Sequence, residues 1–290
     1  MRTKVYGHKI LYFLIAMAAL APVWGQSTLE VKTKKISDAD WEVRRIEGKV
    51  LWKYHHFGDL FDSQQSITVF EVDLSDETIG VSVPHVESGF VKTSEFSWNS
   101  GATVGINGSF FNTKTGGSVV FLKSGDSIHS RTVEGFNAYR ENAGFSIHGD
   151  GSVAVLGRPD TGWESLTGYS TILASGPLLI EDNFLVAQKD EPFNSNRHPR
   201  TAIGTTADNR LIAVVVDGRN SLAHGMSMGE LALLMEALGC TQAMNLDGGG
   251  SSTAWVKGHG VVNHPSDNKL FDHQGERAVA NAICIVLVQQ

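Results

Sequence analysis

The sequence predicts an α/β or α+β fold, with a single domain built on a mixed, mostly β central sheet and a βαβ unit near the C-terminus. Three patterns support this prediction: many short segments with period-two alternation, one continuous apolar run at Leu211–Val216, and an amphipathic helix directly after that run. Alternation indicates a strand with one buried face, and a continuous run indicates a strand covered on both faces. The length of 290 residues allows one large domain or two small ones.

The first residues have the features of a signal peptide. Three basic residues precede an unbroken apolar run, Ile10–Leu20, which is shorter than the ~20 residues that a membrane-spanning helix needs. We place cleavage after Gly25 and expect the mature protein to be secreted or periplasmic. The predicted divisions are a signal peptide (1–25), an N-terminal strand and lapping segment (26–65) and one main domain (66–290).

The charge balance limits the partners. Removal of residues 1–25 leaves 21 Lys and Arg against 31 Asp and Glu, a net charge of −10. Nucleic acids and anionic membrane surfaces select basic faces, so neither is expected to bind. The negative net charge does not exclude a small anionic ligand that is held by a few local hydrogen-bond donors. The two cysteines, Cys240 and Cys284, either pair in an oxidising compartment or are buried as small apolar residues beside strands.

The N-terminal part of the sequence predicts mainly strands and turns. Residues 27–60 are polar with scattered aromatic residues, and we expect an edge strand and a loop lapping the domain. From Ile67 onward the alternation is typical of strands. Asp150-Gly151, between two alternating segments, predicts a hairpin with a type I′ turn. Glu181–Asn183 is expected to close another hairpin.

The C-terminal half predicts a strand–helix–strand unit. Ser227 followed by Glu230 forms a capping box, apolar residues at the spacing of one helix face follow it, and Gly239 can end the helix in a left-handed cap. Ala243–Leu246 then forms the second strand. Strands joined in this way run parallel with a right-handed crossover, so their carboxyl ends should meet at one edge of the sheet, where open α/β sheets bind ligands.

Polar residues follow both strands at this edge. Asp217 follows the first strand, and the loop Asp247–Ser252 follows the second, with Asn245 on the same face as Asp247. Consecutive glycines let several N–H groups point into one concavity that suits an anion such as phosphate. Asp247 could act beside it as an acid, a base or a nucleophile. The structural alternatives are a tight glycine turn with surface serines and, for Asp217, a plain turn.

Other candidates come from separate segments. Arg200 could capture a phosphate through two hydrogen bonds, or be a surface arginine. Phe110 and Phe111 follow a polar turn and could stack on a sugar, although such a pair is more often core. The glycosylation pattern that begins at Asn107 is discounted, because a glycan there would cover the site. The histidines show no metal-ligand spacing and are expected mostly at the surface. Glu276-Arg277 could be an ion pair that caps the last strand.

Six motifs in sequence order resemble the phosphodiester glycosidase family. They are Gly105–Phe111, Pro199–Gly204, Val216–Arg219, Asn245–Ser252, Asn263–Asp267 and Glu276–Val279. The resemblance runs from about residue 66 to the C-terminus. It implies a glycoside hydrolase that cleaves the bond between the anomeric carbon of a sugar and a phosphodiester oxygen, with N-acetylglucosamine-1-phosphodiester as a candidate substrate. Ser109 and His198 depart from the family pattern.

Carried over by position, the resemblance implies two groups of site residues. The catalytic group is Asp247, Asp217, Asn245 and Glu276. The group that binds substrate and phosphate is Asn107, Gly108, Ser109, Arg200, Thr201, Arg219, Gly248, Gly249, Gly250, Ser251, Ser252, Asp267 and Arg277. Asp247 or Asp217 is expected to be the base or nucleophile, while the glycine loop and Arg200 hold the phosphate. Binding of Ca²⁺ or Mg²⁺ between the two carboxylates stays open, and no other cofactor is implied.

Two other functions stay open. A non-catalytic protein that binds a carbohydrate or glycopolymer could use the same fold, because a fold alone does not imply activity. A phosphodiesterase would break the P–O bond instead of the C–O bond.

Overall fold

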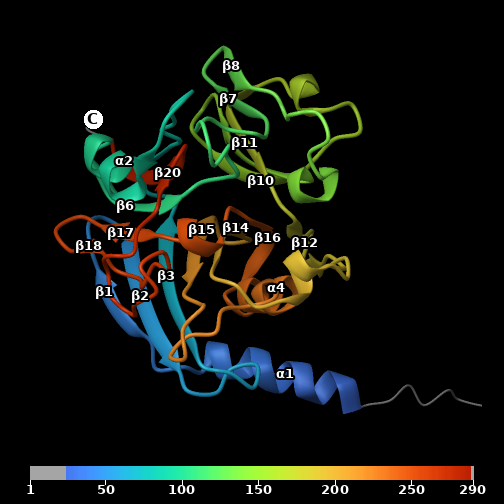
Figure 1. Ribbon diagram of the computed structural model, residues 1–290, viewed down its shortest axis with the longest axis vertical. Coiled ribbons are helices and arrows are strands. Elements are labelled where there is room, and N and C mark those ends of the chain that lie inside the picture. Colours follow the sequence, from blue (N-terminus) through green and yellow to red (C-terminus); the bar gives the residue numbers. More distant parts are fainter. Residues whose placement is uncertain (1–23, 289–290) are drawn as a thin grey trace, which may run out of the picture.

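The computed structural model describes residues 24–288, and an eight-stranded sheet forms its centre (Figure 1). The strand order is β1-β2-β3-β15-β14-β16-β12-β13. These strands are β1 (Glu42–Arg45), β2 (Val50–Phe57), β3 (Gln65–Asp73), β12 (Leu178–Glu181), β13 (Phe184–Leu185), β14 (Arg200–Thr206), β15 (Arg210–Val216) and β16 (Cys240–Asn245).

Smaller sheets lie on one side of the large sheet. The first has the order β18-β17-β6-β20-β4 and contains β4 (Ile79–Ser82), β6 (Ala102–Asn107), β17 (Ala254–Val256), β18 (Gly260–Val261) and β20 (Ala282–Leu287). The second has the order β10-β9-β11-β7-β8 and contains β7 (Leu122–Ser124), β8 (Ser127–Ser130), β9 (Ala143–His148), β10 (Val153–Gly157) and β11 (Tyr169–Ser175). A short pair joins β5 (Val91–Lys92) and β19 (Ala278–Val279).

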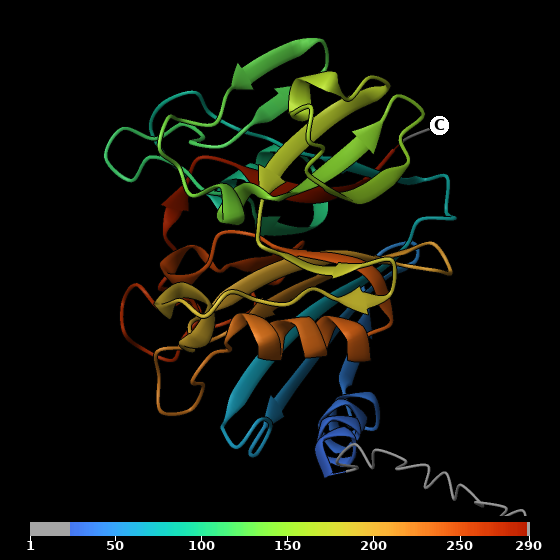
Figure 2. The ribbon, with the colours of Figure 1, turned by 90° about the vertical axis from the view of Figure 1, so that its right-hand side faces the viewer.

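Helices α1 and α4 cover the opposite side of the large sheet (Figure 2). The helices are α1 (Trp24–Ser37), α2 (Thr93–Asn99), α3 (Pro192–Ser195) and α4 (Met228–Ala237), and the 3₁₀ turns are η1 (Ala138–Glu141), η2 (Trp163–Ser165) and η3 (Gly249–Ser251). In β15, Val215 faces the core shared with the smaller sheets, whereas Val214 and Val216 face the core under the helices. Burial of both faces explains why this strand is a continuous apolar run.

The predicted mostly β domain is confirmed, but its central sheet is not mixed. Within residues 24–288, every pair of neighbouring strands in the sheets is antiparallel. Strands β15 and β16 both pair with β14, which lies between them. They therefore run in the same direction without being neighbours, and Asp217 and Asp247 follow them at the same edge. The handedness of the connection through α4 stays a prediction.

Helix α4 begins and ends as predicted. The Ser227 hydroxyl accepts a hydrogen bond from the Glu230 N–H at 3.3 Å, and the Glu230 carboxylate accepts one from the Ser227 N–H at 2.9 Å. Gly239 follows the last turn with a φ of +87°, which is the left-handed conformation that glycine adopts without steric cost.

Both predicted hairpins form, with a correction to the turn type. Strands β9 and β10 pair as expected, but only Gly151 in their loop has a positive φ. A type I′ turn needs a positive φ at both central residues. That pattern occurs instead in the hairpin of β12 and β13, where Asp182 and Asn183 have φ values of +49° and +69°.

The N-terminal segment is more structured than the predicted edge strand and loop. It contains helix α1, the edge strand β1 and the long strand β2, and Ile36 of α1 is fully buried. The predicted signal peptide lies outside the described residues except for Trp24 and Gly25, which begin α1. Within the described chain, no helix has the length and apolar character needed to cross a membrane.

The two cysteines are buried free thiols. Cys240 lies in β16 and Cys284 in β20, and burial raises their thiol pKa values to about 12 and about 11. Of the two alternatives, pairing is not formed, and both residues are buried as small apolar side chains.

Candidate active site

Asn107 joins the ends of several strands beneath the glycine loop. It ends β6 and is fully buried. Its Oδ1 accepts hydrogen bonds from the Thr201 hydroxyl at 2.7 Å and the Thr253 N–H at 3.1 Å. Its Nδ2 donates to the backbone carbonyls of Asp247 at 2.8 Å and Gly108 at 3.2 Å. All hydrogen-bonding positions of the amide are used by the protein, so Asn107 and Thr201 position the site rather than face a ligand.

Gly108 and Ser109 pack against Asn281, a residue that the sequence analysis did not single out. A Cβ on Gly108 would lie 2.1 Å from Asn281 Oδ1, so only glycine fits. The Ser109 N–H donates to that same oxygen at 2.6 Å, and the Ser109 hydroxyl donates to the Ala174 carbonyl at 2.6 Å. The available signal for Asn281 was a polar residue within an apolar strand segment.

Asp217 is buried and accepts four hydrogen bonds. Its Oδ1 accepts from Asn263 Nδ2 at 3.0 Å and from the His264 N–H at 2.8 Å. Its Oδ2 accepts from the Ser66 hydroxyl at 2.6 Å and from His264 Nδ1 at 2.9 Å. Since protein donors surround both oxygens, the prediction of Asp217 as a base or nucleophile is corrected. Asp217 is a positioning residue that orients the His264 ring.

His264 was expected at the surface, but its side chain is only 12% exposed. Its ring stacks on Phe271, with ring centroids 3.8 Å apart and an interplanar angle of 7°. Within residues 24–288, no group of three or more His, Cys, Asp or Glu side chains is placed to hold a metal ion. This result does not test binding of Ca²⁺ or Mg²⁺ between the two carboxylates of Asp217 and Asp247 alone.

The glycine loop uses most of its N–H groups internally. Gly248 N–H donates to its neighbour Asp247 Oδ1 at 2.9 Å, and Gly249 N–H donates to the Pro199 carbonyl at 2.9 Å. The N–H groups of Ser251 and Ser252 close the 3₁₀ turn η3. Only Gly250, among the loop residues described, has an N–H without an acceptor in the protein. The expected cradle of several N–H groups is therefore corrected to a rigid loop with one free donor.

Asp247 is the carboxylate that remains available. The residue as a whole has intermediate exposure, and protein surrounds its carboxyl group closely enough that burial raises the pKa of that group. The Ser251 hydroxyl, the Gly248 N–H and the charges of Arg277 and Arg219 oppose this rise in pKa. The Ser251 hydroxyl lowers the pKa of Asp247 by lying near the carboxylate, although it makes no hydrogen bond of ordinary geometry.

Two guanidinium groups flank the loop. Arg277 binds Asp267 through two hydrogen bonds of 2.7 Å, and this ion pair lies directly over Gly250, where an added Cβ would be 1.8 Å from Asp267 Oδ1. Arg219 is exposed, and its guanidinium would lie 2.9 Å from a Cβ on Gly249. The glycines thus allow both side chains to approach the loop backbone closely.

Arg200 does not have the predicted role. It is 1% exposed, and its Nε and Nη2 atoms donate to the carbonyls of Met226, Phe193 and Asn196 at 2.7–2.9 Å. Burial without an ion-pair partner lowers the pKa of Arg200 to about 10. The guanidinium edge needed for bidentate phosphate capture is occupied, so Arg200 braces three loop carbonyls instead.

Glu276 also lies outside the site. Its two oxygens accept hydrogen bonds from the Ser94 N–H and the Ser94 hydroxyl, both at 2.7 Å, in the first turn of α2. A carboxylate at this position stabilises the positive end of the helix dipole. The predicted Glu276-Arg277 ion pair is wrong, because each residue binds a different partner.

Several buried polar atoms near the loop have no hydrogen-bond partner. They are Asn245 Oδ1 and the hydroxyls of Ser251, Ser252 and Thr253. The Asn245 Nδ2 donates to the carbonyls of Gly176 at 2.8 Å and Leu246 at 2.5 Å, so its oxygen is the free end. Buried polar groups nearly always bind a partner, and these four atoms are suited to a polar ligand or to water.

A groove of about 500 Å³ adjoins Arg277. Phe90, Phe111, Thr113, Arg277 and Ala278 line it. Phe90 and Phe111 pack edge to face with ring centroids 5.9 Å apart, and Phe90 is 41% exposed. Phe110, the other aromatic residue of the predicted pair, packs in a separate apolar cluster.

The model of the phosphodiester glycosidase family matches residues 100–286, which is more than half of the chain. The chain belongs to the phosphodiester glycosidase family. Among curated relatives, the N-acetylglucosamine-1-phosphodiester alpha-N-acetylglucosaminidase of Bos taurus is 29% identical over 203 residues, 64% of this chain and 37% of that protein. The SPbeta prophage-derived uncharacterized protein YomE of Bacillus subtilis (strain 168) is 34% identical over 140 residues, 47% of this chain and 21% of that protein. The chain therefore spans well under half the length of these two relatives.

Solved structures share the fold of this chain. The catalytic domain of zebrafish N-acetylglucosamine-1-phosphodiester alpha-N-acetylglucosaminidase, auto-inhibited by its pro-peptide, has a TM-score of 0.65 and 20% identity, and the match covers 87% of this chain and 89% of that one. A hypothetical protein from Synechocystis has a TM-score of 0.67 and 15% identity, covering 86% and 64% of the two chains. At these identities the likeness shows the fold alone.

Proposed function

We propose that this member of the family is a hydrolase that cleaves the glycosyl–phosphate bond of a sugar-1-phosphodiester. The observation that carries the proposal is the Asp247 carboxyl group, on which the charges of Arg219 and Arg277 act, in a residue of intermediate exposure. The name of the bovine relative supports N-acetylglucosamine-1-phosphodiester as the first substrate to test.

The chemistry of the bond fits this arrangement of charges. A phosphodiester is a good leaving group, so its departure needs stabilisation of negative charge more than protonation. Arg219 and Arg277 supply fixed positive charge, and the Gly250 N–H supplies one donor, for the departing phosphate oxygens. Asp247 serves as the base or nucleophile. Asp217 takes no part in the reaction, because protein donors already bind both of its oxygens.

The mechanism needs one bond to form and one to break at the anomeric carbon. As a base, Asp247 would take a proton from water while the water oxygen attacks this carbon and the C–O bond to the phosphate breaks. As a nucleophile, the carboxylate would attack the carbon itself, and water would release the sugar in a second step. Both routes require the carboxylate form of Asp247.

The raised pKa of Asp247 gives a pH dependence with a defined sign. A base or nucleophile loses activity as the pH falls through its pKa, so this loss should begin at a higher pH than for an exposed aspartate. If Asp247 were a general acid, activity would instead fall as the pH rises. The pH profile of kcat/KM separates the two roles.

The direct test is turnover of the chain on a panel of sugar-1-phosphodiesters, beginning with the N-acetylglucosamine compound. Asp247→Asn is expected to lower kcat/KM by roughly 10²- to 10⁴-fold. Asp126→Asn is the matched control, because Asp126 is exposed in the hairpin between β7 and β8. Equal activity of Asp247→Asn and the wild type would refute the proposed role of this residue.

Asp247→Asn should also stay folded, so that a loss of turnover reports on the reaction and not on unfolding. Because the pKa of Asp247 is raised in the folded state, its ionisation destabilises the fold above the pKa of the unfolded chain. Asp247→Asn removes that cost, so at neutral pH its free energy of unfolding should equal or exceed that of the wild type. Thermal unfolding at acidic and at neutral pH checks this sign.

Hydrolysis in ¹⁸O-water distinguishes the rival functions. Label in the released sugar supports glycosidase cleavage of the C–O bond, whereas label in the phosphate supports a phosphodiesterase. Binding of the panel compounds without turnover would support a carbohydrate- or glycopolymer-binding protein.

We also propose that the chain is exported after removal of residues 1–25. The basic and apolar segments of the N-terminus support this proposal. N-terminal sequencing of the protein from the culture medium or periplasm should begin at Gln26. An intact N-terminus on a cytoplasmic protein would refute it.

A further inference from the structure

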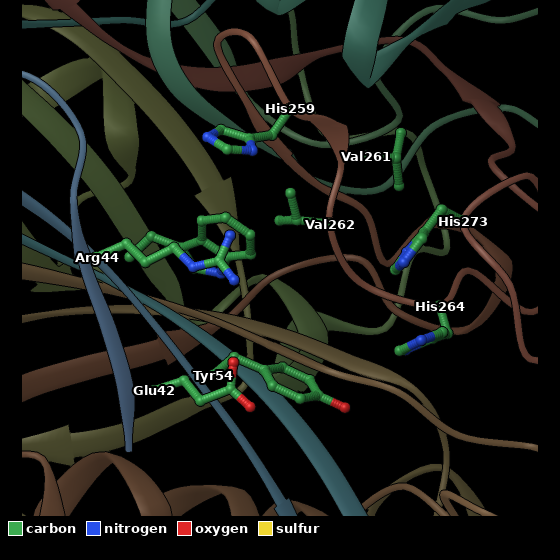
Figure 3. Close-up of a pocket in the computed structure, with 9 residues that line it drawn as sticks. Glu42, Arg44, Tyr54, His259, Val261, Val262, His264 and His273 are labelled. Atoms are coloured by element: carbon green, nitrogen blue, oxygen red, sulfur yellow. The ribbon is translucent and has the colours of Figure 1, made fainter.

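A cavity of about 290 Å³ lies between the large sheet and the segment that follows β17, apart from the glycine loop. One wall comes from neighbouring strands, where Glu42 pairs with Tyr54 and Arg44 pairs with Trp52. Residues two apart on a strand face the same side, so these four side chains form one surface. Figure 3 shows Arg44, Glu42 and Tyr54 around the same space as the histidines of the other wall.

The opposite wall consists mostly of three histidines, His259, His264 and His273. The His259 ring packs against Trp52 with centroids 5.4 Å apart, and the His264 and His273 rings stack at 4.7 Å. The Arg44 guanidinium lies 4.9 Å from the centre of the Trp52 ring. The cavity is therefore bounded by flat rings, with charged and polar groups between them.

Several polar atoms around the cavity keep unused hydrogen-bonding capacity. The Ser66 hydroxyl donates to Asp217, so the Tyr54 hydroxyl, 3.3 Å from Ser66, donates to it and keeps its own oxygen free to accept. His264 Nδ1 is held by Asp217, which leaves Nε2 for another partner.

We propose that this cavity is a binding site for one neutral sugar ring. Flat aromatic faces pack against the apolar C–H face of a sugar, while free donors and acceptors bind its hydroxyls. The volume is close to the lower end for small-molecule pockets, roughly 300 Å³.

This site goes beyond the proposed hydrolysis, because it does not include Asp247 or the glycine loop. Asn263 nevertheless joins the two: its Nδ2 donates at 3.0 Å both to Asp217, behind the cavity, and to the carbonyl of Ser252 in the loop. Asn263 and Asp217 therefore connect His264 of the cavity wall to the glycine loop through hydrogen bonds.

Titration with the methyl glycosides of glucose, galactose and N-acetylglucosamine tests the proposal, by calorimetry and by tryptophan fluorescence. At least one should bind saturably to the wild type. Trp52→Phe, which replaces the indole by a smaller ring and so reduces the flat face of this wall, should weaken binding about five- to tenfold and reduce the fluorescence change. The matched control is Trp98→Phe, because Trp98 is 73% exposed on α2. Tyr54→Phe is a second cavity variant.

Each outcome decides the proposal independently of the hydrolase assignment. Binding weakened by the cavity variants and retained in Trp98→Phe and Asp247→Asn supports it. Absence of saturable binding by the folded wild type overturns it, whatever the turnover assay shows. Binding that is lost in Asp247→Asn but unchanged in Trp52→Phe and Tyr54→Phe also overturns it, and places the sugar at the glycine loop.

Discussion

Replacement of Asn107 by alanine tests whether this residue positions the site or binds the substrate. The change removes four hydrogen bonds to buried or loop atoms, two accepted by Oδ1 and two donated by Nδ2. At about 1 kcal/mol for each net bond, the loss is roughly 4 kcal/mol. The Thr253 N–H would also lose its acceptor in a buried position. We therefore expect Asn107→Ala to lower the free energy of unfolding by about 3–5 kcal/mol.

The assay is urea unfolding of the wild type and of variants at Asn107 and Thr201. Thr201→Val removes only the bond to Asn107 Oδ1 and should cost about 1 kcal/mol. It also serves as the milder variant if Asn107→Ala does not fold. In the double variant the two effects should be less than additive, because both remove the same bond. An Asn107→Ala protein within about 1 kcal/mol of wild-type stability, with a strongly raised KM, would refute the positioning role.

Three further predictions follow from the site and its surroundings. Glu276→Gln should keep kcat within about twofold. It should lower the free energy of unfolding by roughly 0.5–1 kcal/mol, because its interaction with the α2 dipole is weaker. A loss of kcat near ~100-fold would instead indicate that Glu276 is catalytic. Gly250→Ala should displace the ion pair above the loop and lower kcat/KM by about 10²-fold, whereas Gly229→Ala, which has open space around it in α4, should leave kinetics unchanged. Cys240 and Cys284 should resist a thiol reagent in the folded protein and react as two free thiols after unfolding without reductant; absence of any reaction after unfolding would indicate pairing.

Local rules predicted the parts of the fold that depend on neighbouring residues. The capping box at Ser227, the left-handed Gly239 and the two hairpins each follow from a few adjacent side chains. The strand order does not, because it depends on pairing between distant segments. The insertion of β14 between β15 and β16 is the clearest case: the sequence between those two strands gives no sign of a third strand from earlier in the chain.

In the candidate site, the sequence predicted which residues lie close together but not what each of them does. Motif positions identified residues that converge, including Asn107, Asp247 and Arg277. They did not reveal which side chains are already occupied. Arg200 and Asp217 both have the chemistry expected of a site, but protein carbonyls and donors bind them. Hydrogen-bond occupancy depends on three-dimensional contacts, so it could not be predicted from spacing.

The internal bonds of the glycine loop decide which groups can meet an anionic substrate. Because acceptors in the protein bind all the described loop N–H groups except that of Gly250, the loop has little capacity left to hold an anion. The positive charge must then come from side chains, and Arg219 and Arg277 are the ones that act on Asp247. Glycine at positions 249 and 250 serves this arrangement by clearing space for those side chains rather than by presenting donors. The loop is thus a rigid platform, and under the proposed function the charges above it would bind the phosphate.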